Sequence, residues 1–151
     1  IAFDGGMIIL GCGITGPEGT CTAVDQCLAR GEIREGHTTV EHGGTVANGG
    51  FKYVNLCGRS LHCDVRMASG SWKRVADAAS ADIVTRPAMA LYYETCPDAP
   101  CDIACAVLSK DADPGEIKEI INTPERQGAV FADGRSVMVT RGTDGIKISI
   151  S

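Results

Sequence analysis

The feature that most constrains the fold of this chain is a set of eight cysteines in 151 residues. They stand at Cys12, Cys21, Cys27, Cys57, Cys63, Cys96, Cys101 and Cys105. An even number of cysteines in a chain of this size predicts a disulfide framework in which all eight are paired, and hence an oxidising compartment. Eight cysteines allow on the order of 100 pairings, and the sequence does not choose among them.

Two other states of the cysteines stay open, zinc ligation and free thiols. The spacing of Cys96, Cys101 and Cys105 matches no zinc finger or zinc ribbon, so we expect no metal and no cofactor. The chain begins with Ile1 and shows no signal peptide, which is typical of a mature secreted protein whose leader has been removed. The prediction is a single secreted, cysteine-rich domain over residues 1–151.

Composition and charge disfavour several classes of function. The net charge is −5 and the isoelectric point is near 5.1, which argues against a protein that binds the phosphate backbone of nucleic acids. Aromatic residues make up 5% of the chain, with one tryptophan, which leaves few side chains on which sugars could stack. No apolar run approaches the ~18 residues that a membrane-spanning helix needs, so we expect no membrane span.

Residues 51–68 hold the strongest secondary-structure pattern, FKYVNLCGRSLHCDVRMA. It predicts two strands joined into a hairpin by a turn at Gly58-Arg59-Ser60. In the second strand Leu61, Cys63, Val65 and Met67 share one face, and His62, Asp64 and Arg66 share the other. The first strand is apolar on both faces, which is typical of a strand covered by packed layers on both sides.

Three segments favour helices. Residues 21–30 have a threonine cap, apolar residues at helical spacing and a glycine stop at Gly31. Residues 71–84 repeat Trp72, Val75, Ala79 and Ile83 at steps of three and four. The third helix starts at Asp113-Pro114 and continues through EIKEII.

The other segments favour strands. These are residues 3–10, 32–41 and 88–96, and the three tail segments GAVFA, RSVMVT and IKISIS; residues 102–110 fit a strand or a short helix. The order of helices and strands does not alternate strictly. It predicts an α+β fold in which an antiparallel or mixed sheet carries helices on one face, held together by disulfides.

The histidines suggest one catalytic possibility. A carboxylate, a histidine and an arginine on a concave sheet could cleave RNA, with the carboxylate as base, the histidine as acid and the arginine on the phosphate. Glu35, His37, His62 and Arg66 could supply such a set. The alternative is that these residues are ordinary solvated positions on an edge strand and an outer face. A metal site built from His37 and His42 has no standard spacing.

A second candidate is the segment Cys96-Pro97-Asp98-Ala99-Pro100-Cys101. Two prolines would pre-organise Pro97, Asp98, Ala99 and Pro100 as the exposed loop of a disulfide-braced binding module such as a protease inhibitor. His62 and Arg66 are the other binding candidates. The sequence contains no Gly-x-Ser-x-Gly elbow and no phosphate-binding loop, so we assign no catalytic residue.

The order of these parts resembles the killer toxins of smut fungi and related small secreted fungal effectors. The segment ILGCGITGPEGTC followed by TAVDQCLAR is similar to their first strand, glycine-rich turn and first helix. YVNLCGRSLHCDVRM looks like their pair of cysteine-bearing strands, and EIKEII and RSVMVT like their closing helix and strand. The resemblance implies a secreted split β-α-β sandwich. It covers about half of the chain, transfers no functional residue, and allows channel inhibition as one activity.

These observations lead to one predicted function with two alternatives. The first is a secreted, disulfide-rich toxin or effector that binds a host or competitor protein and does not catalyse a reaction. The alternatives are a protease inhibitor that uses the braced loop and a small secreted hydrolase such as a ribonuclease.

Overall fold

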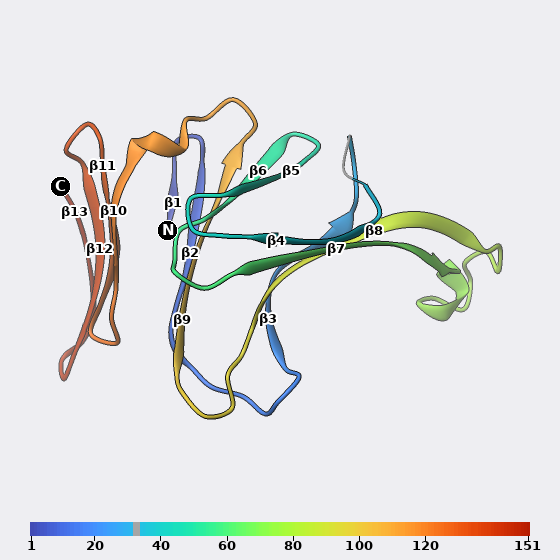
Figure 1. Cartoon of the computed structure of the whole chain (residues 1–151), viewed down its shortest axis with the longest axis horizontal. Coiled ribbons are helices and arrows are strands. Elements are labelled where there is room, and N and C mark those ends of the chain that lie inside the picture. The colour runs from blue at the N-terminus through green and yellow to red at the C-terminus, as the bar shows by residue number, and fades with distance from the viewer. Residues whose placement is uncertain (32–33) are drawn as a thin grey trace.

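The computed structural model of the protein describes residues 1–31 and 34–151 and consists of three antiparallel sheets (Figure 1). Sheet A has the order β1 (Ala2–Phe3), β2 (Gly6–Ile14), β9 (Cys101–Ser109), β6 (Phe51–Asn55) and β5 (Thr45–Asn48). Sheet B has the order β3 (Cys21–Leu28), β8 (Val84–Glu94), β7 (Leu61–Gly70) and β4 (Gly36–Val40). Sheet C has the order β10 (Ile117–Asn122), β11 (Arg126–Phe131), β12 (Ser136–Gly142) and β13 (Gly145–Ile150).

Sheet A lies between the other two, and both of its faces are covered (Figure 1). On β9, Ile103 and Cys105 pack into the core shared with sheet B, and Ala106 and Leu108 pack into the core shared with sheet C. Successive side chains of a strand point to opposite faces. The continuous apolar run of β9 therefore fits a strand that is covered on both faces.

Both strands expected within residues 51–68 are present, but they do not form a hairpin. The first strand, β6, pairs with β5 and β9 in sheet A, whereas the second, β7, pairs with β4 and β8 in sheet B. The turn at Gly58–Ser60 thus carries the chain from one layer to the next. Asn55 holds this crossing, because its buried amide donates to the carbonyl oxygens of Val40 and Arg59 at 2.8 and 2.6 Å.

The helix predicted at residues 21–30 is strand β3, which pairs with β8. A register shift between Ala23 and Asp25 inserts a bulge. The bulge lets Val24 and Cys27 both reach the core, although they are three positions apart. An extra residue in a strand therefore produced the spacing that is typical of a helix.

The helix predicted at residues 71–84 is also wrong. This segment contains one 3-10 turn, Trp72–Arg74, and otherwise forms the connection between β7 and β8. The stripe expected to be buried is exposed instead, with Trp72 at 67%, Val75 at 79% and Ile83 at 72%. A short amphipathic segment gains little helical stability when no apolar surface covers it.

For the third predicted helix, only the start is confirmed. The Asp113 carboxylate accepts a hydrogen bond from the Gly115 amide at 2.9 Å, and Pro114–Glu116 forms one 3-10 turn. The chain then continues as strand β10, not as a helix. The α+β fold with helices on one face is therefore corrected to a layered β-sandwich, since no α-helix occurs in residues 1–31 and 34–151. The strands expected in the tail are confirmed as β11, β12 and β13.

The predicted disulfide framework is absent as well. All eight cysteines lie among the described residues, and each carries a free thiol. Cys63, Cys101 and Cys105 are buried, and in the cores they act as small apolar side chains. Three packed sheets give a chain of this length enough apolar burial that the cysteines need not be joined.

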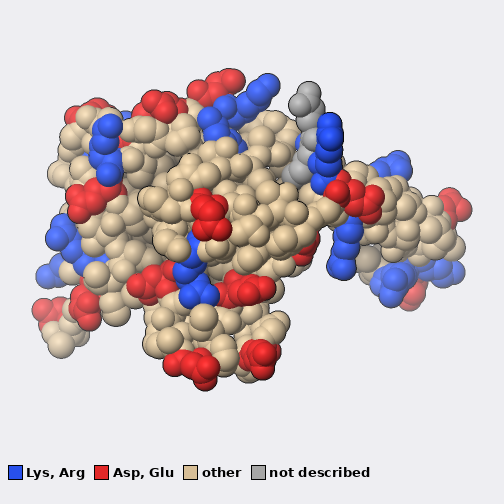
Figure 2. All heavy atoms as spheres, in the orientation of Figure 1, with Lys and Arg blue, Asp and Glu red and all other residues tan. Residues whose placement is uncertain are grey.

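The strand predicted at residues 32–41 appears as β4, Gly36–Val40, and Glu32 and Ile33 lie outside the described residues. Figure 2 shows that basic and acidic side chains are interspersed over the visible face of the layered body. Among the described residues, none forms a helix with the length and apolar character that crossing a bilayer requires.

Candidate functional site

The outer face of sheet B, which points away from sheet A, carries a group of hydrogen-bonded polar side chains. The predicted alternation along β7 is confirmed. Leu61, Cys63 and Val65 are buried against sheet A. His62, Asp64 and Arg66 therefore project from the outer face, where the neighbouring strands β4 and β8 add their own outward side chains.

Four side chains on this face form the outer-face cluster: His37, His62, Asp64 and Tyr92. Strand register brings them together, since His37 lies opposite Asp64 and His62 lies opposite Tyr92. The Asp64 carboxylate lies at the centre. One of its oxygens is 2.7 Å from His37 Nδ1, and the other accepts a hydrogen bond from the Tyr92 hydroxyl at 2.9 Å.

His37 also links the cluster to His62 and to one further group, the hydroxyl of Thr39. His37 Nε2 lies 3.3 Å from the Thr39 hydroxyl and 3.4 Å from His62 Nδ1. The rings of His37 and His62 are stacked with centroids 5.4 Å apart. Because an ionised carboxylate only accepts hydrogen bonds, His37 donates through Nδ1 and its Nε2 accepts in the neutral ring.

Hydrogen bonding shifts the acid–base properties of the cluster. The bond from His37 holds the pKa of the Asp64 carboxyl below its ordinary value, and the Tyr92 hydroxyl adds to the effect. The same bond to Asp64 raises the pKa of Tyr92 to about 12. Asp64 is therefore ionised and Tyr92 neutral near pH 7.

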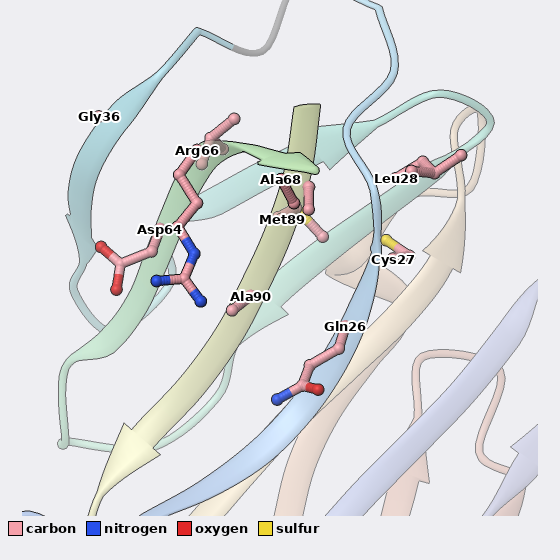
Figure 3. Close-up of a pocket in the computed structure, with 11 residues that line it drawn as sticks. Gln26, Cys27, Leu28, Gly36, Asp64, Arg66, Ala68, Met89 and Ala90 are labelled. Carbon is pink, nitrogen blue, oxygen red and sulfur yellow. The ribbon is translucent and has the colours of Figure 1, made fainter. Parts of the chain in front are cut away.

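An open hollow of about 730 Å³ lies beside the cluster (Figure 3). Small side chains form its floor, namely Ala68 on β7 with Ala88 and Ala90 on β8. Longer side chains rise on both sides, Asp64 and Arg66 from β7 and Gln26 and Leu28 from β3. The hollow exists because alanines on the central strand β8 lie between longer residues on its neighbours.

The structure brings together only part of the predicted catalytic set. His37 and His62 are adjacent, and Arg66 lines the hollow. Glu35 is occupied elsewhere, since its carboxylate accepts a hydrogen bond from the Met67 amide at 3.2 Å. His42 takes no part in the cluster, and no group of three metal-binding side chains occurs in the described part of the chain.

Two members of the cluster were not singled out from the sequence, Asp64 and Tyr92. Asp64 had a usable signal, because it alternates with His62 and Arg66 on the polar face of β7. Tyr92 had none. Its neighbour Tyr93 is as aromatic and is fully buried, and only the pairing of β8 with β7 decides which of the two points outward.

The predicted binding loop lies apart from this face. Pro97, Asp98, Ala99 and Pro100 are all exposed in the connection between β8 and β9. No disulfide braces this loop, since Cys96 and Cys101 both carry free thiols. Instead the Arg59 guanidinium donates to the Glu94 carbonyl oxygen at 2.9 Å and to Cys96 Sγ at 3.2 Å.

Comparison with known proteins identifies the fold. No protein-family model and no curated protein matches the chain. Among solved structures, a chondroitinase AC lyase studied with bound oligosaccharides matches 99% of this chain at 18% identity, with a TM-score of 0.74. The chondroitin AC lyase of Streptomyces coelicolor A3, solved with chondroitin sulphate, matches 99% at 18% identity and a TM-score of 0.62. A Paenibacillus xanthan lyase matches 99% at 16% identity and a TM-score of 0.64.

These matches show a shared β-sandwich fold. The chain spans about a quarter of the two chondroitin lyases, 25% and 24%, and 20% of the xanthan lyase. The expectation of a non-catalytic toxin or effector is corrected by this finding, because the neighbours are polysaccharide lyases. The inhibitor and ribonuclease alternatives fall with it. The resemblance to killer toxins stays a sequence-based prediction.

Proposed function

We propose that this chain is the β-sandwich part of a carbohydrate-active enzyme related to polysaccharide lyases, and that it binds an acidic polysaccharide on the outer face of sheet B. The observation that carries the proposal is the match over 99% of the chain to a chondroitinase AC lyase. Chondroitin sulphate and xanthan, named for the neighbours, are both polysaccharides that bear negative charges. The activity of the complete enzyme is part of the same proposal.

The geometry of the outer face supports this function. A hollow of about 730 Å³ falls within the size range of sites that hold small organic ligands, and it is large enough for a sugar unit. Arg66 offers a guanidinium to a carboxylate or sulfate group, a pairing that can use two parallel hydrogen bonds. Gln26 on the opposite side can donate to and accept from hydroxyl groups.

The outer-face cluster serves this site by positioning, not by proton transfer within this chain. His37 and Asp64 are 50% and 42% exposed, so water screens the pair. A catalytic base needs a more closed and rigid surrounding than an open sheet face provides. The cluster instead holds the wall of the hollow, since the carboxylate of Asp64 is tied to both β4 and β8.

Location outside the cell is a further part of the proposal, because long acidic polysaccharides occur mainly outside cells. The direct test is binding of chondroitin sulphate and of xanthan by isothermal titration calorimetry, with neutral dextran as the reference. We expect both acidic polymers to bind and dextran not to bind.

The variant Arg66→Gln tests the position of the site. We expect it to weaken binding by about fivefold or more, since a charged hydrogen bond is lost. The matched control is Arg141→Gln, an exposed arginine on β12 in sheet C. It should leave affinity unchanged within about twofold. Equal affinity for dextran, or equal effects of the two variants, would contradict the proposal.

A further inference from the structure

Strands β7 and β8 extend beyond the rest of sheet B as a two-stranded arm, residues 66–88 (Figure 1). The partner strands stop early, since β4 reaches only Val65 and β3 reaches only Ala88. Residues 68–70 and 84–86 therefore pair with each other alone. The connection at 71–83 forms the tip of this β7–β8 arm and lies away from the three-layer body.

The tip is ordered by its own backbone. The Val75 amide donates to the Trp72 carbonyl oxygen at 2.9 Å, and the Lys73 amide donates to the Ser80 carbonyl oxygen at 3.0 Å. Lower on the arm, the hydroxyls of Ser69 and Thr85 are 2.7 Å apart. None of these bonds uses the Trp72 side chain, so its indole is presented on a turn that forms without it.

Trp72 is the single tryptophan of the chain, and 67% of it is exposed. A large aromatic side chain that is mostly exposed beside basic residues is typical of an interaction site. The next two residues, Lys73 and Arg74, are basic and exposed, and neither takes part in an ion pair among the described residues. The tip thus combines an aromatic face with two free cations.

The charge of the arm is opposite to that of the rest of the chain. The chain has 14 Lys and Arg against 19 Asp and Glu. Four of the basic residues lie on the arm, Arg66, Lys73, Arg74 and Arg86, against two acidic ones, Asp77 and Asp82. Ten basic and 17 acidic residues remain elsewhere, so the arm carries +2 and the remainder −7. Figure 2 shows basic atoms on the projection that corresponds to the arm.

The arm is also continuous with the candidate site. Ala68 and Ala88 lie at its base and form part of the floor of the hollow. The two pairs of residues beyond Ala68, Ser69 with Thr85 and Gly70 with Val84, add about 7 Å to the ribbon before the tip begins. A polymer that lies in the hollow can therefore continue along the arm to its tip, whereas a single sugar could not contact both places.

We propose that the tip of the β7–β8 arm is a second binding point for the same acidic polysaccharide, with Trp72 stacked on a sugar ring and Lys73 and Arg74 paired with its carboxylate or sulfate groups. This inference rests on the proposed function. The C–H face of a pyranose ring is apolar and packs on the indole, and the cations lie beside it for the charged groups. Two linked contacts on one polymer strengthen binding more than either contact alone.

The single tryptophan makes the test direct. Titration of the protein with chondroitin sulphate or xanthan should change the fluorescence of Trp72, and dextran should not. The variant Trp72→Ala should weaken binding by about fivefold or more, and Trp72→Phe should keep most of the affinity because a flat ring remains. Circular dichroism should show both variants folded, since the indole is exposed.

The charge contribution is tested separately. The double variant Lys73→Gln with Arg74→Gln should weaken binding and make it less dependent on salt, because screening acts on charged contacts. Matched controls lie on the exposed strand β13, Ile148→Ala for the apolar contact and Lys147→Gln for the charge. Both should leave affinity unchanged within about twofold.

The outcomes separate this inference from the proposed function. No binding of acidic polymers by the wild-type protein would overturn both. Suppose that Arg66→Gln weakens binding, while Trp72 fluorescence is unchanged and Trp72→Ala keeps full affinity. This result would contradict the binding role of the arm and leave the proposed function standing. A protein dimer that sedimentation detects and Trp72→Ala abolishes, without an effect on polysaccharide affinity, would show that a second copy occupies the tip and would also overturn it.

Discussion

The two faces of sheet B are built from alternate residues of the same strands, and they behave differently. Tyr93 points inward and is fully buried, and its hydroxyl donates to Asn55 Oδ1 and to the Ala104 carbonyl oxygen, both at 2.9 Å. Tyr92 points outward and donates to Asp64 at the same distance, 2.9 Å, in a partly buried hydrogen bond on the outer face. Two neighbouring tyrosines with equal hydrogen-bond lengths thus have different roles.

The difference follows from solvent access. A buried hydrogen bond has no water to replace it, so its loss leaves unsatisfied groups in the core. An exposed one exchanges with water at little cost. The inner face of sheet B therefore supplies stability, whereas the outer face is free to carry polar groups for binding. Five predictions test this separation, in order of falling effect.

The largest expected contrast is in thiol reactivity. Buried Cys63 and Cys105 should react with a thiol reagent only when the protein unfolds, about a thousandfold or more slower than exposed Cys21. Burial also raises the pKa of Cys105 to about 12, which removes its thiolate. Reagent labelling followed by mass spectrometry measures the rates. In denaturant without reductant, all eight thiols should react; fewer than eight would indicate disulfides.

The second prediction concerns the inner core. Leu91 on β8 is 0% exposed, so Leu91→Ala should lower the free energy of unfolding by about 2–5 kcal/mol. Urea denaturation followed by circular dichroism measures the loss. The control is Ile148→Ala, at a position 69% exposed, where we expect about 0.5 kcal/mol or less. Similar midpoints for the two variants would mean that sheet B is not packed on sheet A as described.

The third prediction compares the two tyrosines by removing each hydroxyl. Tyr93→Phe leaves Asn55 Oδ1 and the Ala104 carbonyl without this donor and should cost about 1–3 kcal/mol. Tyr92→Phe should cost under about 1 kcal/mol, because water replaces the hydroxyl beside Asp64. Both values come from the same denaturation measurement. An equal loss in the two variants would remove the distinction between the faces.

The fourth prediction concerns alkaline pH. Burial raises the pKa values of Tyr53 and Tyr93, and the bond to Asp64 raises that of Tyr92 to about 12, each from 10.0. A raised pKa in the folded state adds stability that is full below pH 10 and is lost as pH rises through the folded value. Ultraviolet titration should show the three tyrosines ionising above pH 10, with unfolding. Ionisation of all three at pH 10 in a folded protein would contradict this.

The smallest effect is expected at Asp64. The hydrogen bond from His37 lowers the pKa of Asp64 in the folded state. Its contribution to folding stability is therefore full above the unfolded-state pKa of about 4 and is lost as pH falls through the folded-state pKa. Asp64→Asn should therefore be slightly less stable than wild type at pH 7, by about 0.5 kcal/mol after solvent screening. The two proteins should converge below about pH 3. A difference that persists there would point to a packing effect instead.

Part of this architecture could be predicted from the sequence. The alternation of residues 61–65 located the buried and outward faces of β7, and the turns in the tail located β11 to β13. The two-sided apolar pattern of residues 51–57 correctly indicated a strand covered twice. The same alternation predicted that His62, Asp64 and Arg66 share the outward face of β7, which now forms part of the candidate site.

Other features could not be predicted, because they depend on contacts between distant segments. The bulge in β3 gave strand residues a helical spacing, and only its pairing with β8 shows it to be a strand. The even number of cysteines suggested disulfides, although packing makes Cys63 and Cys105 members of an apolar core. The apolar repeat at residues 71–84 suggested a buried helix, but Trp72, Val75 and Ile83 are exposed.

The sequence by itself determined the local periodicity, since the alternation of side chains along a strand depends only on backbone geometry. It therefore determined which residues of β7 could share a face. Only the tertiary structure decided that β6 and β7 lie in different sheets, that His37 meets Asp64 across strands, and that Trp72 stays exposed. The reason is that strand pairing and layer packing minimise the free energy of the whole chain, in which each segment's partners are remote in sequence.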